Sequence, residues 1–348
     1  MLKHILVIDD NAVNLKLAEQ TLRPLYKVTL LISGRQALRF LGKTKPDLIL
    51  LDINMPEMDG YETLRKIKED PYTSKIPIIF LTAQTDSESE LHSLYLGAVD
   101  FITKPFISEI MLSRIKIHLE LEEYHKHLER LVEEKTQMIE KLQDVIVTSL
   151  AELVECRDGE TGGHVKRTAK YLQILAEAMY ENGVYKDVLS KQYMKDLLRA
   201  APLHDVGKIG ISDDMLRKQS SLDEEEFEYM KKHTTLGGKT LQKAIDQTGE
   251  ESFLYMARDM ALTHHEKWDG SGYPSGLQGE GIPLCGRIMA VADVYDALMS
   301  KRSYKEPFTY QTAAEMIIKS KGSHFEPCIV EVFEKIRDKF EQIASMYL

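Results

Sequence analysis

Two metal-ligating side chains, His204 and Asp205, stand next to each other, and Lys208 follows three residues later. Adjacent residues of a helix point about 100° apart, so one metal could hold both only in a pocket completed by other segments. The chain supplies further imidazole and carboxylate groups on both sides of this pair. These candidate ligands are Glu160, His164, His233, His264, His265 and Asp293. The set predicts a polynuclear site for divalent ions such as Fe, Mn or Zn, without selecting one.

A second group of acids lies in the first third of the chain. Asp9 and Asp10 follow one apolar run and Asp52 follows another, while Thr82 and Lys104 end or follow later runs. Three carboxylates brought together at neighbouring strand ends would make a hard oxygen site suited to Mg²⁺. A carboxylate can also accept a phosphoryl group when a metal offsets the repulsion, and a nearby hydroxyl and lysine would bind the transferred group.

The first 120 residues alternate short apolar runs with amphipathic stretches. The runs that predict buried parallel strands are residues 5–8, 27–31, 48–51, 78–81 and 98–102. The stretches with helical spacing are residues 14–23, 34–41, 59–69 and 86–96. Five such units predict a doubly wound, flavodoxin-like α/β sheet, whose functional residues lie at the carboxyl ends of the strands.

This arrangement resembles the response-regulator receiver domain of two-component systems. By that resemblance Asp52 is the phospho-acceptor, Phe101 takes the aromatic switch position, and a histidine kinase is the cognate partner. The residues implied to hold Mg²⁺ or the phosphoryl group are Asp9, Asp10, the backbone carbonyl of Asn54, Thr82 and Lys104. No member of this set is missing from the chain.

A long stretch without glycine or proline, residues 120–147, follows. Its apolar residues recur at spacings of three and four, at Leu121, Tyr124, Leu128, Leu131, Met138, Leu142 and Val145. With Glu, Lys and Arg on either side, this pattern predicts a dimeric coiled coil over residues 121–148, in which Lys135 occupies a core position. The alternative is a single amphipathic helix packed on its own domain. If phosphorylation shifts the pairing of receivers, such a helix could pass the change downstream.

From Ser149 onward amphipathic stretches dominate, which predicts an all-α domain. The expected helices span residues 150–155, 168–181, 191–201, 223–233, 236–246, 253–265, 287–299 and 309–319. Gly162 and Gly163 favour a loop-to-helix junction before His164. Asp293 and Asp296 lie three apart on an apolar helix, where a metal partner would offset the free-energy cost of a buried carboxylate.

Three motifs in this domain resemble the HD-GYP family of bacterial cyclic di-GMP phosphodiesterases, over about residues 145–340. They are HDVGK at 204–208, HHEKWDGSGYP at 264–274 and ADVYDAL at 292–298. The resemblance implies two or three ions, Fe or Mn with Zn or Ni as alternatives, with Asp205 bridging and Glu160 permitting a third. The metal ligands it implies are Glu160, His164, His204, Asp205, His233, His264, His265 and Asp293.

The residues expected to act on the substrate are mostly cationic. Lys208 would neutralise the scissile phosphate beside Asp205, and a bridging water activated by the metals would attack phosphorus. The expected substrate-binding residues are Tyr273, Arg287, Arg302 and Lys305. We therefore expect a phosphorylation-regulated hydrolase that opens cyclic di-GMP to pGpG, with further cleavage to GMP left open. The alternatives are a cyclic-dinucleotide sensor that acts through protein contacts and a hydrolase of another cyclic dinucleotide.

Bulk properties limit the remaining choices. A length of 348 residues predicts two domains and a connector, placed at residues 1–120, 121–148 and 149–348. The net charge of −10 argues against DNA binding. The three cysteines show no disulfide or CxxC spacing, and no apolar stretch reaches the ~18 residues of a membrane span. With no secretory signal expected, we predict a cytoplasmic protein.

Overall fold

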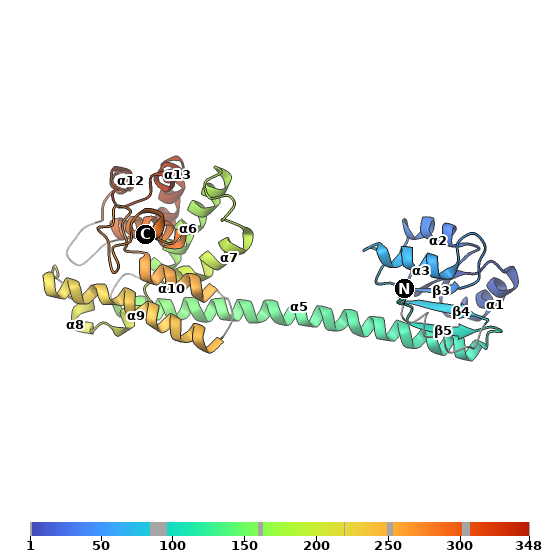
Figure 1. Ribbon diagram of the computed structural model, residues 1–348. Helices are drawn as coiled ribbons and strands as arrows, with labels where there is room; N and C mark the ends of the chain where they lie inside the picture. Colours follow the sequence, from blue (N-terminus) through green and yellow to red (C-terminus); the bar gives the residue numbers. More distant parts are fainter. Residues whose placement is uncertain are drawn as a thin grey trace. The chain divides into compact units, whose positions relative to one another are not determined.

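The computed structural model describes residues 2–83, 96–158, 163–218, 220–248, 253–300 and 307–347. The chain forms two compact units, Met1–Gln137 and Met138–Leu348. Figure 1 shows a mixed sheet-and-helix unit at the N-terminus and a helical unit at the C-terminus, so the predicted fold classes are confirmed. The boundary between the units falls within one long helix, α5 (Ser108–Asp158).

The first unit is built on five parallel strands in the order β2-β1-β3-β4-β5. The strands are β1 (His4–Ile8), β2 (Lys27–Leu31), β3 (Leu48–Asp52), β4 (Ile78–Thr82) and β5 (Asp100–Thr103). Every residue of β1, β3 and β4 is buried, as expected for strands covered on both faces. These strands lie close to the five apolar runs that predicted them.

Helices cover both faces of this sheet. Leu6 and Ile8 pack with residues of α2 (Gly34–Leu41) and α3 (Gly60–Glu69), whereas Ile5 and Val7 pack with α1 (Ala12–Leu22) and the start of α5. This alternation follows from the two-residue period of a strand. The helix predicted at residues 86–96 lies outside the described residues, apart from Leu96.

Helix α5 contains 51 residues and unites the predicted connector with the helix expected at residues 150–155. No glycine or proline interrupts it between Glu120 and Val147. The seven predicted core positions of the coiled coil are between 38% and 67% exposed in the single chain. On its polar side, Glu140 and Asp144 pair with Lys195 and Arg199 of the second unit.

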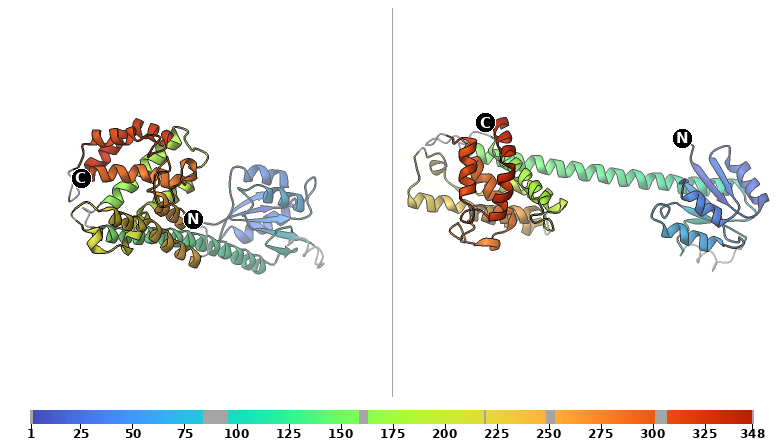
Figure 2. Two further views of the ribbon diagram at one scale, coloured as in Figure 1. Left: turned by 60° about the vertical axis from the view of Figure 1, so that its left-hand side comes forward. Right: turned by 90° about the horizontal axis from the view of Figure 1, so that it is seen from above.

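The second unit is mostly helical in its described residues, with a non-helical segment at residues 264–278. Its longer helices after α5 are α6 (His164–Glu181), α7 (Lys191–Ala200), α9 (Glu224–Thr248), α10 (Phe253–Thr263), α11 (Leu284–Met299), α12 (Tyr310–Lys319) and α13 (Pro327–Tyr347). Short helical turns are η1 (Ala201–Leu203), η2 (Val206–Gly210), α8 (Asp213–Leu216) and η3 (Gly279–Gly281). Figure 2 shows α6, α11 and α13 packed together. Their aromatic side chains form the centre of the core. The rings of Tyr171 and Phe340 are stacked, with 4.8 Å between their centres.

Two expectations about these helices were wrong or incomplete. The helices predicted at residues 223–233 and 236–246 are one helix, α9, because Thr234 and Thr235 between them do not break a helix. Helix α13 was not predicted, although Phe333, Ile336 and Phe340 recur at helical spacing and are buried. Within the described residues, no helix is both long enough and apolar enough to cross a membrane.

Candidate metal centres

The His204–Asp205 pair lies between the 3₁₀ turns η1 and η2, at the point where the chain meets α9. A Cβ atom on Gly207 would lie 1.9 Å from the carbonyl oxygen of His233 and 2.4 Å from the backbone nitrogen of Gly237. Only glycine permits this backbone-to-backbone approach. The approach brings Asp205 beside His233, although 28 positions separate them in the numbering.

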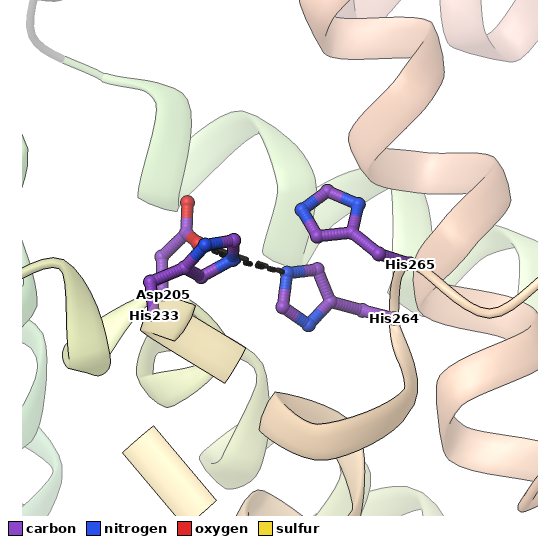
Figure 3. Close-up of side chains that lie close together, drawn as sticks. All are labelled: Asp205, His233, His264 and His265. Carbon is purple, nitrogen blue, oxygen red and sulfur yellow. Dashed lines mark hydrogen bonds and ion pairs between the residues drawn. The ribbon is translucent and has the colours of Figure 1, made fainter. Parts of the chain in front are cut away.

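The first cluster of candidate ligands consists of Asp205, His233, His264 and His265, with ligand atoms within 4.8 Å of one another. Oδ1 of Asp205 lies 3.4 Å from Nε2 of His233 and 3.6 Å from Nε2 of His264. Figure 3 shows Asp205 and His233 approaching from one side, and His264 and His265 from the other. His264 and His265 directly follow α10, which ends at Thr263.

The second cluster consists of His164, His204 and Asp293. Nε2 of His164 lies 3.4 Å from Nε2 of His204 and 3.6 Å from Oδ1 of Asp293. Oδ2 of Asp205 lies 3.5 Å from Nε2 of His204, while Oδ1 faces the first cluster. The Asp205 carboxylate therefore lies between the two clusters, with one oxygen toward each.

The hydrogen bonds of the imidazoles test whether this site fits a cation. Nδ1 of His204, His233 and His264 lies 2.8, 2.8 and 3.0 Å from the carbonyl oxygens of Ala201, Met230 and Met260, respectively. A carbonyl only accepts, so Nδ1 carries the proton and the Nε2 lone pairs point at one another and at Asp205. Oδ1 of Asp205 is buried without a hydrogen bond. Oδ2 is paired with Nζ of Lys208, so only Oδ1 faces the imidazole lone pairs without a partner. A divalent metal would satisfy that oxygen.

Burial also sets the protonation of this site. It lowers the pKa of His204 to about 4 and lowers the pKa of His233 and His265 from the ordinary value of 6.5. These imidazoles are therefore neutral at pH 7, which is the form that binds metals. Burial opposes ionisation of Asp205, yet Lys208 and the neighbouring histidines hold its pKa well below the usual value. The ligands thus have the charge states that a metal requires.

His164 is oriented by a buried ion pair that the sequence did not predict. Gly163 has a φ of 112° and leads into α6, so His164 is the first helical residue, as the junction at Gly162–Gly163 indicated. Its Nδ1 lies 2.8 Å from Oδ2 of Asp296. Arg167 donates to both oxygens of Asp296 at 2.7 and 2.9 Å. The cation that compensates Asp296 is therefore Arg167, and the expectation of a metal partner applies to Asp293 alone.

The last turn of α5 also bonds to the site. Oδ2 of Asp158 lies 2.5 Å from Nζ of Lys208, which lies 2.9 Å from Oδ2 of Asp205. Glu155 accepts a hydrogen bond of 2.7 Å from the backbone N–H of His164. The sequence did not indicate these roles for Glu155 and Asp158, because acidic residues on a charged helix look like solvated ones.

The predicted substrate-binding residues have different outcomes. Arg302 and Lys305 lie outside the described residues, as does the predicted metal ligand Glu160. The Tyr273 ring lies 4.8 Å from the His265 ring and so adjoins the first cluster. Arg287 is buried, and its Nη1 lies 2.6 Å from Glu326 and 2.8 Å from the Tyr185 hydroxyl. The guanidinium of Arg287 is thus held by partners in the core, which does not support its predicted contact with substrate.

The acids of the first unit also gather at one point. Asp9, Asp10 and Asp52 offer oxygens within 4.8 Å of one another. Nζ of Lys104 lies 2.7 Å from both Asp9 and Asp52. Burial raises the pKa of Asp52, and the hydrogen bond from Lys104 opposes this effect. The donor set is oxygen only, which fits Mg²⁺ rather than a softer metal.

Two further predicted positions lie at this edge of the sheet, and a third, Phe101, lies within a strand. Thr82 is buried at the end of β4, and the backbone of Asn54 forms a hydrogen bond to Asp52. Phe101 lies on β5 with the Arg114 guanidinium 5.4 Å from its ring centre. The structure therefore brings the predicted phosphoryl-site residues together at the carboxyl ends of the strands.

Comparison with known proteins assigns both units. Residues 5–116 match the response regulator receiver domain, and residues 160–329 match the HD domain. A probable cyclic di-GMP phosphodiesterase of Vibrio cholerae serotype O1 is 41% identical over 351 residues, covering 99% of this chain and 80% of the relative. The chain belongs to the family of response regulators with an HD domain. HD domains are metal-dependent phosphohydrolases, and this chain is an enzyme of that class.

Two other relatives bear on the substrate. The cyclic di-GMP phosphodiesterase response regulator RpfG of Xanthomonas campestris pv. campestris is 33% identical over 355 residues, covering 99% of this chain and 90% of the relative. A 3'3'-cGAMP-specific phosphodiesterase 2 of Vibrio cholerae is 44% identical over 200 residues, covering 58% of this chain and 36% of the relative. Relatives of this HD response regulator thus include proteins named for two cyclic dinucleotides.

Proposed function

We propose that this chain hydrolyses cyclic di-GMP to pGpG under the control of receiver phosphorylation. The observation that carries the proposal is the position of Asp205, whose Oδ1 faces His233 and whose Oδ2 faces His204 of the other cluster, beside Lys208. A carboxylate so placed is suited to bridge two ions. The choice of cyclic di-GMP as substrate is supported by two relatives that are named for it and match 99% of this chain.

The proposed ligands divide between the two clusters. His233, His264 and His265 would hold one ion, His164, His204 and Asp293 the other, and Asp205 would bridge them. Glu160 is proposed as a ligand of a third ion. Fe or Mn is the proposed metal, with Zn or Ni as alternatives. When bound, divalent ions activate water as a nucleophile and neutralise charge on the phosphodiester.

The chain's own cations complete the substrate site in this proposal. Lys208 lies beside Asp205 and would contact the scissile phosphate. Tyr273 adjoins His265 and would contact the nucleotide. Arg302 and Lys305 stay in the proposal on the strength of their motif positions alone. The proposed product is pGpG, and a second cleavage of pGpG to GMP is left open.

Regulation is proposed to begin at Asp52. A histidine kinase would supply the phosphoryl group, with Mg²⁺ held by Asp9, Asp10 and the carbonyl of Asn54. The exposed apolar stripe on α5 would pair with the same stripe of a second copy, as a coiled coil over residues 121–148. The last turn of α5 bonds to Lys208 and to His164, which gives a route from that helix to the metal ligands.

The proposed domains are residues 1–120, 121–148 and 149–348, and the division between the two compact units falls inside the middle one. The three cysteines form no disulfide, which agrees with the reducing cytoplasm as the proposed location. The net charge of −10 supports the proposal that DNA is not a partner.

The decisive experiment is product analysis with defined metals. The full-length protein would be loaded anaerobically with Fe²⁺, Mn²⁺, Zn²⁺ or Ni²⁺ and incubated with cyclic di-GMP, with and without beryllofluoride as a phosphoryl mimic. Appearance of pGpG or GMP supports the proposal and identifies a competent metal, and Asp52→Asn controls for the effect of beryllofluoride. Tight binding of cyclic di-GMP without product for every metal would instead favour a sensor.

A second candidate substrate is 3'3'-cGAMP, favoured by the relative that is 44% identical over 200 residues and is named for it. The same incubation with 3'3'-cGAMP separates the candidates. A higher kcat/KM for 3'3'-cGAMP than for cyclic di-GMP would replace the proposed substrate while leaving the metal chemistry unchanged.

A further inference from the structure

Two aromatic rings and a lysine form a group beside the first metal cluster, which we call the aromatic lip: Phe227, Lys231 and Tyr273. The Tyr273 ring lies 4.8 Å from the His265 ring at an interplanar angle of 32°. The Phe227 ring lies 6.2 Å from the Tyr273 ring at 79°. Within the aromatic lip, Tyr273 is therefore next to the proposed metal ligand His265, and Phe227 lies on Tyr273.

Lys231 gives the aromatic lip a positive charge. Its Nζ lies 4.9 Å from the centre of the Phe227 ring and 5.3 Å from the centre of the Tyr273 ring. Glu228 lies 2.5 Å from the same Nζ and is largely exposed. Lys231 and Phe227 are four residues apart on α9, so they lie on one face of that helix.

Phe227 is 46% exposed, although its ring contacts two other residues of the aromatic lip. Single exposed apolar side chains are common on protein surfaces. Here the exposed ring stands next to a cation and, through Tyr273, next to a metal cluster. Exposed aromatic rings combined with cations are what nucleotide-binding surfaces use to stack bases.

We infer that the aromatic lip binds one purine base of the substrate and discriminates guanine from adenine. Phe227 would stack on the base, and Lys231 would donate hydrogen bonds to its O6 and N7 edge. Guanine presents two acceptors on that edge, whereas adenine presents one acceptor and an amino donor. A lysine at that edge therefore favours guanine. The inference rests on the proposed function, since it names the subsite that selects among cyclic dinucleotides.

The test uses four variants of the full-length, Mn²⁺-loaded protein. Phe227→Ala and Lys231→Met change the aromatic lip, and Phe227→Trp restores a ring. Tyr229 and Lys232 form a matched lysine–aromatic pair on the same helix, with Nζ 5.1 Å from the ring centre. Tyr229 is about 200° around the helix from Phe227, so Tyr229→Ala is the control for loss of a ring.

Each variant is assayed for kcat and KM with cyclic di-GMP, with cyclic di-AMP and with bis(p-nitrophenyl) phosphate, which has no base. Phe227→Ala is expected to raise KM for cyclic di-GMP by about 5- to 100-fold, the loss of one stacked base. Its kcat and its activity on bis(p-nitrophenyl) phosphate should stay within about twofold of the wild type, and Phe227→Trp should restore KM. Lys231→Met should lower the preference for cyclic di-GMP over cyclic di-AMP, which has no guanine, by about 5- to 100-fold.

Equilibrium binding gives a readout that does not depend on turnover. The dissociation constant of a hydrolysis-resistant phosphorothioate analogue of cyclic di-GMP should rise in parallel with KM in Phe227→Ala. Unchanged KM and binding in Phe227→Ala, or equal changes in Tyr229→Ala, would overturn the inference and leave the proposed function standing. Hydrolysis of bis(p-nitrophenyl) phosphate but of neither dinucleotide by the wild type would overturn both.

Discussion

Asp158 and Lys208 form an ion pair with 2.5 Å between Oδ2 and Nζ, and the same Nζ lies 2.9 Å from Asp205. Asp158 is the last residue of α5. Lys208 thus lies between the end of α5 and the carboxylate proposed to bridge two metals. Any movement of the last turn of α5 would change the charge next to the proposed site of hydrolysis.

Arg157 forms hydrogen bonds that hold the end of α5 against the residues that follow Lys208. It donates to Asp213 at 2.7 Å and to the carbonyls of Ile209 and Ile211 at 2.6 and 3.1 Å. Arg157→Ala should weaken the coupling of the helix to the site, because three of the hydrogen bonds that hold its last turn are lost. Coupling between sites is typically 5- to 150-fold, and we expect the ratio of rates with and without beryllofluoride to fall to within about twofold of one. Arg337→Ala, on an exposed part of α13, should keep the wild-type ratio. An unchanged ratio in Arg157→Ala would exclude coupling through the three Arg157 hydrogen bonds.

Asp205→Asn keeps the shape of the side chain and removes the charge that faces both clusters. The variant should lose bound metal, measured by mass spectrometry of the protein after gel filtration. Its rate should fall by more than about 100-fold, beyond the 10- to 100-fold typical of residues that only orient ligands. Asp214→Asn, on the exposed surface of α8, should retain metal and rate. Full metal content in Asp205→Asn would argue against a bridging role.

Asp296→Asn tests the buried ion pair that orients His164. Arg167 is 1% exposed, so removal of the Asp296 charge leaves a buried cation without compensation. The free energy of unfolding should decrease by about 3–5 kcal/mol, measured by urea denaturation. Asp338→Asn is the control, since its carboxylate is exposed and should change stability by less than about 0.5 kcal/mol. A small change in Asp296→Asn would mean that Arg167 finds another partner.

The stability of the metal-free protein should depend on pH because of His204. Its pKa is about 4 in the folded protein and near 6.5 when unfolded, so the unfolded chain takes up a proton first as the pH falls. Stability is therefore complete above pH 6.5 and decreases down to pH 4, by about 3 kcal/mol from this residue alone. The lowered pKa values of His233 and His265 act in the same direction. Urea denaturation in EDTA between pH 7.5 and 4.5 measures the slope, which His204→Asn should reduce.

Local patterns were sufficient to predict most of the fold. Apolar runs of five or fewer residues identified all five strands, and the central strands β1, β3 and β4 are buried along their whole length. The sequence predicted a break in α9 at Thr234 and Thr235, because the apolar residues there do not follow a regular helical spacing. The long C-terminal helix α13 was missed even though its apolar spacing is regular.

The ligands were easier to predict from sequence than the residues that hold them. Seven of the eight predicted ligands come together in two clusters, and the eighth, Glu160, is not described. Asp293 and Asp296 are the same residue type on the same helix, and only the tertiary structure shows that Arg167 compensates one of them. Arg287 was predicted to contact substrate but is paired with Glu326. The two residues are 39 positions apart in the sequence, so no local pattern indicates the pair.

The close approach at Gly207 has a consequence for metal selectivity. Because η2 and α9 touch through their backbones, the spacing between Asp205 and His233 is determined before any ion arrives. An ion of different radius must then be accommodated by side-chain rotation, since the two segments cannot slide closer together. Engineering of this centre toward another metal should therefore vary the ligand side chains and leave Gly207 unchanged, because this glycine determines the distance between the backbones that carry Asp205 and His233.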